Sequence, residues 1–355
     1  MKSAFVLADR YSDAALKLLV SINVLFFLSF TIVLLIATGQ ARAETPACTG
    51  RSVMEELAAG KPAELARIEA EAAKVINGDR LLWKIEKEGV EPSYLFGTMH
   101  MTDPRVTALT PAAQTAFEEA RTVVIETTDL LDKSQMAAAL AKQPELMMFT
   151  DSTTLTSLLS PEDRAILEKG LAERGIPLAS VIKMKPWMLA AMVALPACEM
   201  ARQASGAPVL DVKLAEEAKA DGKALKGLES VTDQLGAMAS LPMEFHIRGL
   251  VDSLTLGDRM DDIMETMIEL YEREQIAMIV PLINAVTQEA GADNSGYADF
   301  EQTMITARNA TMASHAAPII DQGGAFIAVG ALHLPGPDGV VERLRKAGYT
   351  LTPES

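Results

Sequence analysis

The sequence predicts an α/β protein of the α+β type, with a mixed central β-sheet flanked by helices and a large helical insertion. Short β-prone apolar runs end at Gly97 and Gly330, near the two ends of the 355-residue chain. A helix-forming segment separates the first run from a β-branched run at residues 121–126, which is the pattern of a βαβ unit. Helical periodicity dominates from about residue 130 to residue 310.

Strands are expected near both ends of the chain and once in the middle. Each candidate is a short apolar or β-branched run bounded by turn residues. The candidates are residues 80–85, 93–97, 121–126, 223–229, 325–330 and 348–351. Residues 89–92 predict a hairpin turn between the first two strands, and the Asp221-Gly222 pair predicts a turn before the middle one.

Helices are expected over most of the remaining chain. Thr110 suits the N-cap and Pro111 the first turn of a helix that ends near residue 120. Further helical stretches are residues 136–141, 188–200, 211–220, 229–241, 243–271 and 300–320. The predicted organisation is a helical N-terminal segment at residues 44–79, then one domain at residues 80–355 with a helical insertion at about 130–310.

The first 43 residues have the layout of an export signal. Basic residues precede a charge-free apolar stretch at residues 18–37, and Ala41-Arg42-Ala43 offers a cleavage site before Glu44. The stretch is also about long enough to span a bilayer, so an uncleaved membrane anchor at residues 18–38 is the alternative. In both cases the rest of the chain is expected outside the cytoplasm, either periplasmic or secreted, or held at the inner membrane by that anchor.

Charge and cysteine content narrow the function further. The formal net charge is −16 and no basic cluster occurs, so the chain should repel nucleic acid and anionic membrane surfaces. The two cysteines, Cys48 and Cys198, both lie in the exported part. An even number of cysteines in an oxidising compartment predicts one disulfide, and two cysteines alone cannot form a structural zinc site.

The most informative pattern is a Gly-x-x-His sequence that occurs twice. Gly97 and His100 bound the first copy, Gly330 and His333 bound the second, and the chain has only four histidines. Both copies follow β-prone runs, which are expected to be neighbours in one sheet. Because α/β sheets bind ligands beyond the carboxyl ends of their strands, the two imidazoles should converge on one metal ion or reacting atom. The glycines are expected to let the backbone turn sharply beneath this site.

Two glutamates also end predicted strands, Glu126 and Glu229. Two imidazoles with a carboxylate suit zinc, manganese, cobalt or iron, and a metal-bound water is a nucleophile at neutral pH. A carboxylate that does not bind the metal could act as general base. Structural alternatives stay open, because Glu126 could begin a solvated loop and Glu229 could favour a helix N-terminus. His246 is expected to be structural, and His315 either lines the cleft or packs elsewhere.

The sequence resembles the TraB/PrgY/GumN family, which is similar to the Tiki metalloproteases of animals. The resemblance rests on residues 95–100, a strand ending at Glu126, Arg308-Asn309 and residues 329–339. It spans roughly residues 80–355 and implies a metal-dependent hydrolase, most simply a peptidase that acts on peptides or proteins. The implied cofactor is a divalent manganese, cobalt or zinc ion.

The resemblance also implies roles for individual residues. His100, His333 and Glu126 match the motif residues and are the expected metal ligands. Arg308 and Asn309 match the Arg-Asn element and are expected in the catalytic group with Glu126, since an arginine could hold a substrate carboxylate or stabilise an oxyanion. Two further residues could contribute as ligands, in which case Glu126 would serve as base. These additional residues are Asp211 and Glu229.

Two other classes of function remain as alternatives. The same cleft could hold a metal or haem-like ligand without turnover, in an accessory protein of envelope or polysaccharide machinery. A purely structural partner of such machinery would need neither a metal ion nor the two histidines. The sequence carries no Gly-x-Ser-x-Gly elbow, His-Glu-x-x-His pair or P-loop, which excludes the common forms of those chemistries.

Overall fold

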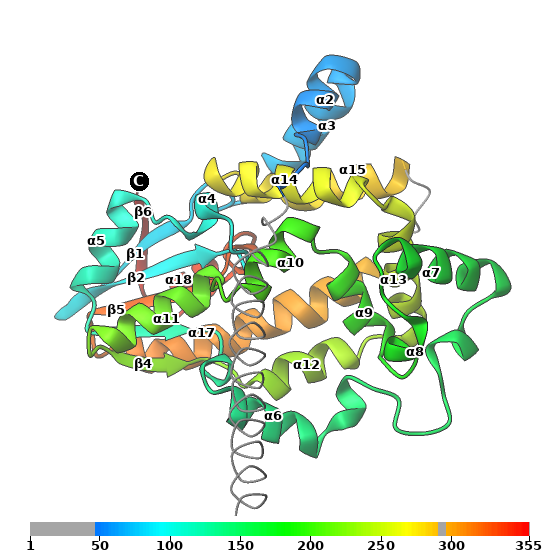
Figure 1. Ribbon diagram of the computed structural model, residues 1–355. Helices are drawn as coiled ribbons and strands as arrows, with labels where there is room; N and C mark the ends of the chain where they lie inside the picture. Colours follow the sequence, from blue (N-terminus) through cyan, green and yellow to red (C-terminus); the bar gives the residue numbers. More distant parts are fainter. Residues whose placement is uncertain (1–46, 290–295, 355) are drawn as a thin grey trace, which may run out of the picture. The chain divides into compact units, whose positions relative to one another are not determined.

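A six-stranded mixed β-sheet forms the centre of the protein (Figure 1). The computed structural model describes residues 47–289 and 296–354, and Ala47–Ser355 form one compact unit. The strand order is β4-β3-β5-β2-β1-β6. The strands are β1 (Leu82–Lys87), β2 (Val90–Thr98), β3 (Thr122–Ile125), β4 (Ala224–Gly227), β5 (Ala325–Gly330) and β6 (Thr350–Glu354). The predicted α/β class with a mixed sheet is confirmed.

Helices surround this sheet and fill the long connection between β3 and β5. The helices before β4 are α2 (Val53–Gly60), α3 (Pro62–Ala72), α4 (Pro104–Thr107), α5 (Pro111–Glu119), α6 (Lys133–Lys142), α7 (Pro161–Glu173), α8 (Leu178–Val181), α9 (Pro186–Val193), α10 (Ala197–Ala204) and α11 (Leu210–Ala220). Those after β4 are α12 (Val231–Ala239), α13 (Met243–Leu256), α14 (Arg259–Glu272), α15 (Ile279–Glu289), α16 (Tyr297–Phe300), α17 (Ala307–Ile320) and α18 (Val340–Lys346). As predicted, the Thr110 hydroxyl caps α5 by accepting from the Ala113 N–H.

Four strands of the sheet run in the same direction. β2 pairs with β5 in parallel, with Gly97 opposite Val329 and Thr98 opposite Gly330. β3 pairs in parallel with β5 on one side and with β4 on the other. The two Gly-x-x-His strands are therefore neighbours, as expected, and the carboxyl ends of all four strands meet at one edge of the sheet.

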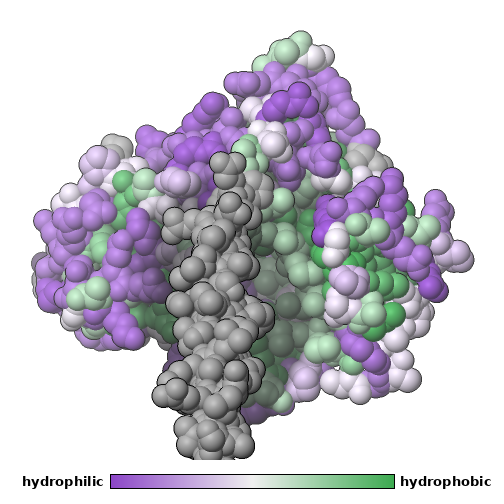
Figure 2. Space-filling model, in the orientation of Figure 1, coloured by the Kyte–Doolittle hydropathy of each residue, from purple (hydrophilic) through white to green (hydrophobic). Residues whose placement is uncertain are grey.

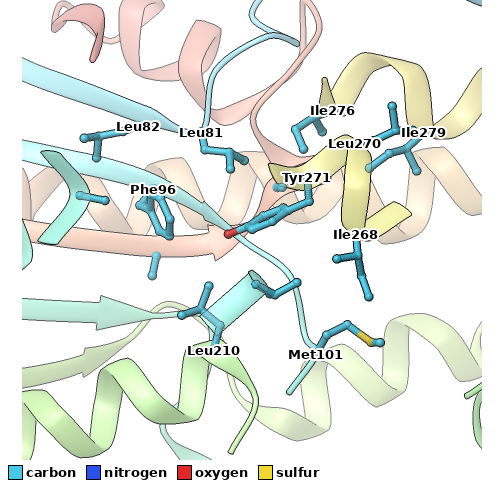
Figure 3. Packing of buried hydrophobic residues seen from close by; sticks show 14 of the residues in the cluster. Leu81, Leu82, Phe96, Met101, Leu210, Ile268, Leu270, Tyr271, Ile276 and Ile279 are labelled. Atoms are coloured by element: carbon cyan, nitrogen blue, oxygen red, sulfur yellow. The ribbon is translucent and has the colours of Figure 1, made fainter. Parts of the chain in front are cut away.

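Apolar side chains alternate between the two faces of the sheet, so both faces are buried. Phe96 and Phe326 lie on one face, with their ring centroids 5.6 Å apart, and pack towards α5, α11 and α14. Figure 3 shows this cluster, including Leu210 of α11 and Tyr271 of α14. Leu95 and Ile327 point to the other face, where they pack with residues of α17 and α18.

The helical region between β3 and β5 has a core of its own. Residues of α7, α9 and α13 form it, including Leu167, Leu189 and Leu250. Figure 2 shows hydrophobic residues gathered on the surface over this region, whereas hydrophilic residues cover most of the remaining visible outer surface. Among the described residues, no helix has both the length and the apolar character needed to cross a membrane. The predicted export signal or anchor lies outside the described residues.

Several predicted boundaries are wrong for local reasons. The hairpin turn is only Glu88 and Gly89, because Lys87 pairs with Val90, and Gly89 has the positive φ (74°) that tight hairpins favour. Residues 243–271 form two helices rather than one, and they separate at Gly257, whose φ is 52°. Glu229 does not begin a helix, because α12 starts at Val231 after the capping side chain of Ser230.

The N-terminal helices are attached to the rest of this unit by packing and by a covalent bond. The backbone N–H of Val53 donates to the hydroxyl of Thr266 on α14 at 2.8 Å. Cys48 forms a disulfide with Cys198 of α10, as the cysteine count predicts. Such a bond is compatible with an extracellular location.

Candidate functional site

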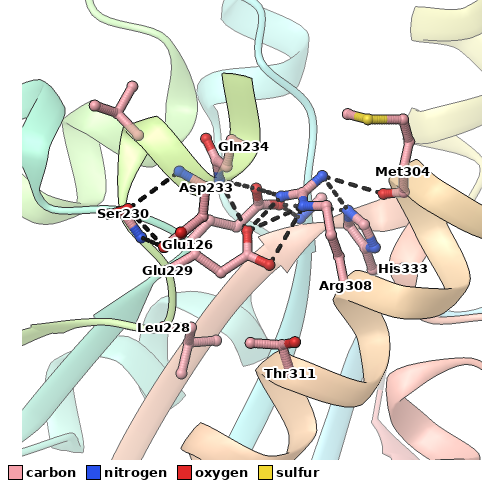
Figure 4. A network of polar contacts seen from close by, with 12 residues as sticks. Glu126, Leu228, Glu229, Ser230, Asp233, Gln234, Met304, Arg308, Thr311 and His333 are labelled. Atoms are coloured by element: carbon pink, nitrogen blue, oxygen red, sulfur yellow. Dashed lines mark hydrogen bonds and ion pairs between the residues drawn. The ribbon is translucent and has the colours of Figure 1, made fainter. Parts of the chain in front are cut away.

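Five polar residues meet at the carboxyl edge of the parallel strands. His100 follows β2, Glu126 follows β3, Glu229 follows β4 and His333 follows β5, while Arg308 lies in the first turn of α17. Four of these residues line one pocket of about 360 Å³, and Glu229 lies behind Arg308. Figure 4 shows how Glu126, Glu229, Arg308 and His333 face one another. The expected convergence of the two histidines with Glu126 is therefore present in the fold.

The ring of His333 is held in one orientation by Asn309. Its Nδ1 lies 2.6 Å from the side-chain oxygen of Asn309, whose amide nitrogen donates to the carbonyl of Asp338 at 2.9 Å. Because the amide oxygen can only accept, Nδ1 must carry the proton and Nε2 is left with a lone pair. Burial lowers the pKa of His333 to about 4, so the ring is neutral at pH 7.

His100 has a different partner and a different charge. Its Nδ1 lies 2.8 Å from Asp211, whose other oxygen accepts from the hydroxyl of Thr98 at 2.7 Å. The side chain is 57% exposed, but it is exposed into the pocket, so protein atoms surround it on several sides. Burial lowers the pKa of His100, but the negative charge of Asp211 and its hydrogen bond outweigh this and raise the pKa to about 9.

Glu126 is a buried and ionised carboxylate. One oxygen accepts from the backbone N–H of Gly330 at 2.7 Å, and the other accepts from Arg308 at 2.7 Å and Gln234 at 3.0 Å. Burial raises its pKa, but both histidines, which are protonated in the acid range where Glu126 titrates, together with Arg308 and the Gly330 hydrogen bond, lower it to about 2. Such a weak base suits a ligand or a charge partner better than a proton acceptor.

Arg308 joins the two glutamates at the ends of β3 and β4. Its Nη2 lies 2.7 Å from Glu126 and 2.9 Å from Glu229, and its Nε donates to Glu229 at 3.0 Å. Nη1 donates to the Met304 carbonyl at 3.2 Å and lies 3.4 Å from Nε2 of His333. All three nitrogens of the guanidinium thus face protein acceptors, so the arginine orders the site and does not present a free fork to a substrate.

Two residues expected to act directly instead support the histidines. Asn309 is buried and does not line the pocket, so its contact with His333 makes it a positioning residue. Asp211 is also buried and holds His100 through Nδ1. Second partners of this kind fix the tautomer and orientation of metal-binding histidines. Glu229 forms an ion pair with Arg308, whereas the alternative interpretation of the sequence expected it to interact with the N-terminus of a helix.

The glycines of both motifs allow close packing through their small size. Neither Gly97 nor Gly330 has a positive φ, so neither position requires glycine for a left-handed conformation. A Cβ on Gly97 would lie 2.7 Å from a methyl carbon of Leu334. A Cβ on Gly330 would lie 3.2 Å from the carboxylate of Glu126 and 3.4 Å from the ring of His333. Glycine thus allows the strand ends and the site residues to approach closely.

The chemistry of the donor set fits a divalent transition metal. Nδ1 of each histidine is engaged, which leaves Nε2 as the ring atom that would bind a metal, and Glu126 supplies an ionised carboxylate. At neutral pH a metal ion would have to displace the proton that the raised pKa of His100 keeps on its Nε2. However, no group of three or more histidine, cysteine, aspartate or glutamate side chains in the described part of the chain is arranged to hold a metal. Arg308 contacts one oxygen of Glu126 and lies 3.4 Å from Nε2 of His333, the ring atom that would bind a metal.

Further residues support the site from outside the two motifs. The hydroxyl of Tyr271 on α14 donates to the Gly97 carbonyl at 2.8 Å, directly beneath the first motif (Figure 3). Gln234 bridges Glu126 and Glu229. His246 and His315 bond backbone carbonyls and do not line the pocket, which agrees with structural roles. No local sequence signal distinguishes Tyr271 from the other apolar positions of its helix.

The fold and this site define an α/β protein whose polar cluster lies beyond the carboxyl ends of parallel strands. The chain belongs to the TraB/PrgY/gumN family, whose family model matches residues 81–353. It is similar to the metalloprotease TIKI1 of Danio rerio, with 26% identity over 314 residues. The match covers 76% of this chain and 62% of that relative, so the chain spans less than two thirds of its length. No solved structure matches the chain.

Proposed function

We propose that the protein is an exported metal-dependent hydrolase, most simply a peptidase, whose metal ion is held by His100, His333 and Glu126. The observation that carries this proposal is the pairing of each motif histidine with a second residue through Nδ1, beside an ionised glutamate. That arrangement is the usual support of catalytic metal sites. Family membership and the similarity to a metalloprotease support the same class.

The chain's own residues would prepare the reaction by fixing charges and protons. When bound, the metal ion would lower the pKa of a water molecule and polarise the carbonyl of the substrate. Asp211 and Asn309 keep the Nδ1 protons of the two histidines in place. Arg308 balances the charges of Glu126 and Glu229. The apolar pocket wall would exclude bulk water, which strengthens electrostatic interactions in the site.

Metal content tests this proposal most directly. The purified chain is dialysed against manganese, cobalt or zinc, and bound metal is measured for wild type and for a His100→Ala/His333→Ala double variant. The matched control is His315→Ala, because His315 lies outside the pocket and bonds only a backbone carbonyl. We expect about one ion per chain in wild type and control, and loss in the double variant.

Activity completes the test. Peptide hydrolysis should require the metal, stop with a chelator and disappear in the double variant but not in His315→Ala. A folded wild type that binds none of the three metals would overturn the proposal, and so would full hydrolysis by the double variant. Absorbance in the haem Soret region of the purified chain would instead support the alternative of a non-catalytic binding protein.

A further inference from the structure

The wall of the pocket is unusually rich in methionine. Four half-buried methionines line it, and we call them the methionine wall: Met99, Met264, Met267 and Met304. They come from three separate parts of the chain, namely the end of β2, helix α14 and the π-helical stretch Glu301–Thr306. Leu332 and Phe300 extend the same apolar surface. The fold therefore gathers flexible apolar side chains at one place beside the polar site.

The methionine wall lies beside the proposed reaction site, in the same pocket. Met99 immediately precedes His100, and Leu332 immediately precedes His333. The carbonyl of Met304 accepts from Arg308, and Figure 4 shows Met304 beside Arg308 and His333. The π-helical turn that carries Met304 is itself a rare geometry that often occurs at functional sites. A group bound against this wall would lie next to both histidines.

Size and chemistry limit what this pocket can bind. A volume of about 360 Å³ is at the lower end of the roughly 300–1,000 Å³ of small-ligand pockets, so it suits one or two residues of an extended chain. Methionine is unbranched and polarisable, so a surface built from it adapts to several apolar shapes. The charged groups at the pocket's polar end are already paired, Glu126 with Arg308 and His100 with Asp211. A charged substrate side chain that lies against the methionine wall would therefore be desolvated without a charged partner there.

We propose that the methionine wall is the specificity pocket of the enzyme, and that it binds a large apolar side chain of the substrate next to the bond that is cleaved. Leucine, methionine, isoleucine or phenylalanine would be accepted there, and aspartate or lysine rejected. This inference rests on the proposed hydrolase function and assigns its substrate class.

Cleavage of a matched peptide series tests the preference. The peptides are blocked at both ends and differ only at one position beside the cleaved bond, where they carry leucine, phenylalanine, alanine, aspartate or lysine. We expect kcat/KM for leucine to exceed that for alanine by at least about 10-fold, since each lost methylene in an apolar pocket costs about 10-fold or more. A Met267→Trp variant should reduce this ratio by filling the pocket. Met148→Trp, at an exposed methionine outside the pocket, should leave it unchanged.

A binding readout separates this inference from the proposed function. With methyl-13C-methionine in the chain, N-acetyl-leucinamide should shift the methyl signals of Met264, Met267 and Met304, whereas N-acetyl-aspartamide should not. If Met267→Trp does not fold, Met304→Ala serves as the second variant. It should weaken the shifts that N-acetyl-leucinamide causes in the methyl signals of the remaining wall methionines. Cleavage without apolar preference would overturn the specificity pocket alone. If no peptide is cleaved, leucinamide shifts would still support an apolar ligand, and their absence would overturn the inference.

Discussion

Replacing Asn309 by leucine tests how the ring of His333 is held. The amide of Asn309 is buried and makes two hydrogen bonds, one from Nδ1 of His333 at 2.6 Å and one to the carbonyl of Asp338 at 2.9 Å. Leucine has a similar size, so the variant removes the hydrogen bonds without leaving a large cavity. The effect therefore measures the polar contacts themselves.

The size of the effect follows from burial. His333 is only 4% exposed, so its Nδ1–H would lose its partner without gaining water, which costs about 1–3 kcal/mol. The carbonyl of Asp338 also accepts from Nε of Arg343 at 2.9 Å and keeps that bond in the variant, so the loss of the Asn309 donor there should add little. We expect Asn309→Leu to lower the free energy of unfolding by about 2 kcal/mol. Because the ring would also lose its orientation, metal affinity should fall by about 10–100-fold.

Urea unfolding followed by circular dichroism measures the first effect, and titration with cobalt measures the second. The control is Ser314→Ala, an exposed position on the same helix, which should change stability by less than about 0.5 kcal/mol. A variant with unchanged stability and unchanged cobalt affinity would refute the reasoning, because the hydrogen bond would then hold neither the fold nor the ring.

Three further predictions concern the disulfide, a buried carboxylate and a motif glycine. Replacing both Cys48 and Cys198 by serine should lower the free energy of unfolding by up to about 5 kcal/mol, from the chain entropy of a sequence separation of 150, and should make urea unfolding insensitive to reductant. Burial raises the pKa of Glu199, but hydrogen bonds from its neighbours outweigh burial and lower the pKa. The ionised Glu199 therefore stabilises the folded state fully above about pH 4.5, and this contribution is lost as the pH falls further. Glu199→Gln should thus flatten the pH dependence of stability between about pH 5 and pH 3, and an unchanged slope would contradict this assignment. Gly330→Ala should leave the backbone unstrained, because φ is −52°, yet reduce metal binding by crowding Glu126; equal cobalt affinity in both proteins would exclude that crowding.

Much of the fold could be predicted from the sequence, because strands and helix caps depend on residues that are close together in the chain. The runs before Gly97 and Gly330 are short, apolar and β-prone, and they form paired parallel strands. Thr110 marks its helix start because a side-chain cap involves residues only three apart. The hairpin turn was misplaced because Pro92 resembles a turn residue. In the structure it lies in β2 before pairing with β5 begins at Tyr94, where its missing N–H costs no ladder hydrogen bond.

The contacts within the site were less predictable because they join distant parts of the chain. Arg308 could be recognised by motif, but its contact with Glu229 depends on how α17 crosses the end of β4. The bond from Tyr271 to Gly97 depends on the packing of α14 over β2. Neither has a fixed spacing in the sequence. The close approach at the two glycines was not predicted for a related reason, since it involves neighbours elsewhere in the chain, such as Leu334 for Gly97 and Glu126 for Gly330.

The two copies of the motif place chemically unequal histidines at one sheet edge. A carboxylate beside an imidazole stabilises its proton, and Asp211 accordingly raises the pKa of His100 to about 9. A neutral amide gives no such charge, and the buried ring beside Asn309 has a pKa of about 4. The anion near Nε2 of His333 is instead Glu126, at 3.8 Å, and its charge is shared with Arg308. The same Gly-x-x-His pattern thus gives one imidazole a raised pKa and the other a lowered pKa, because their partners come from different helices, α11 and α17.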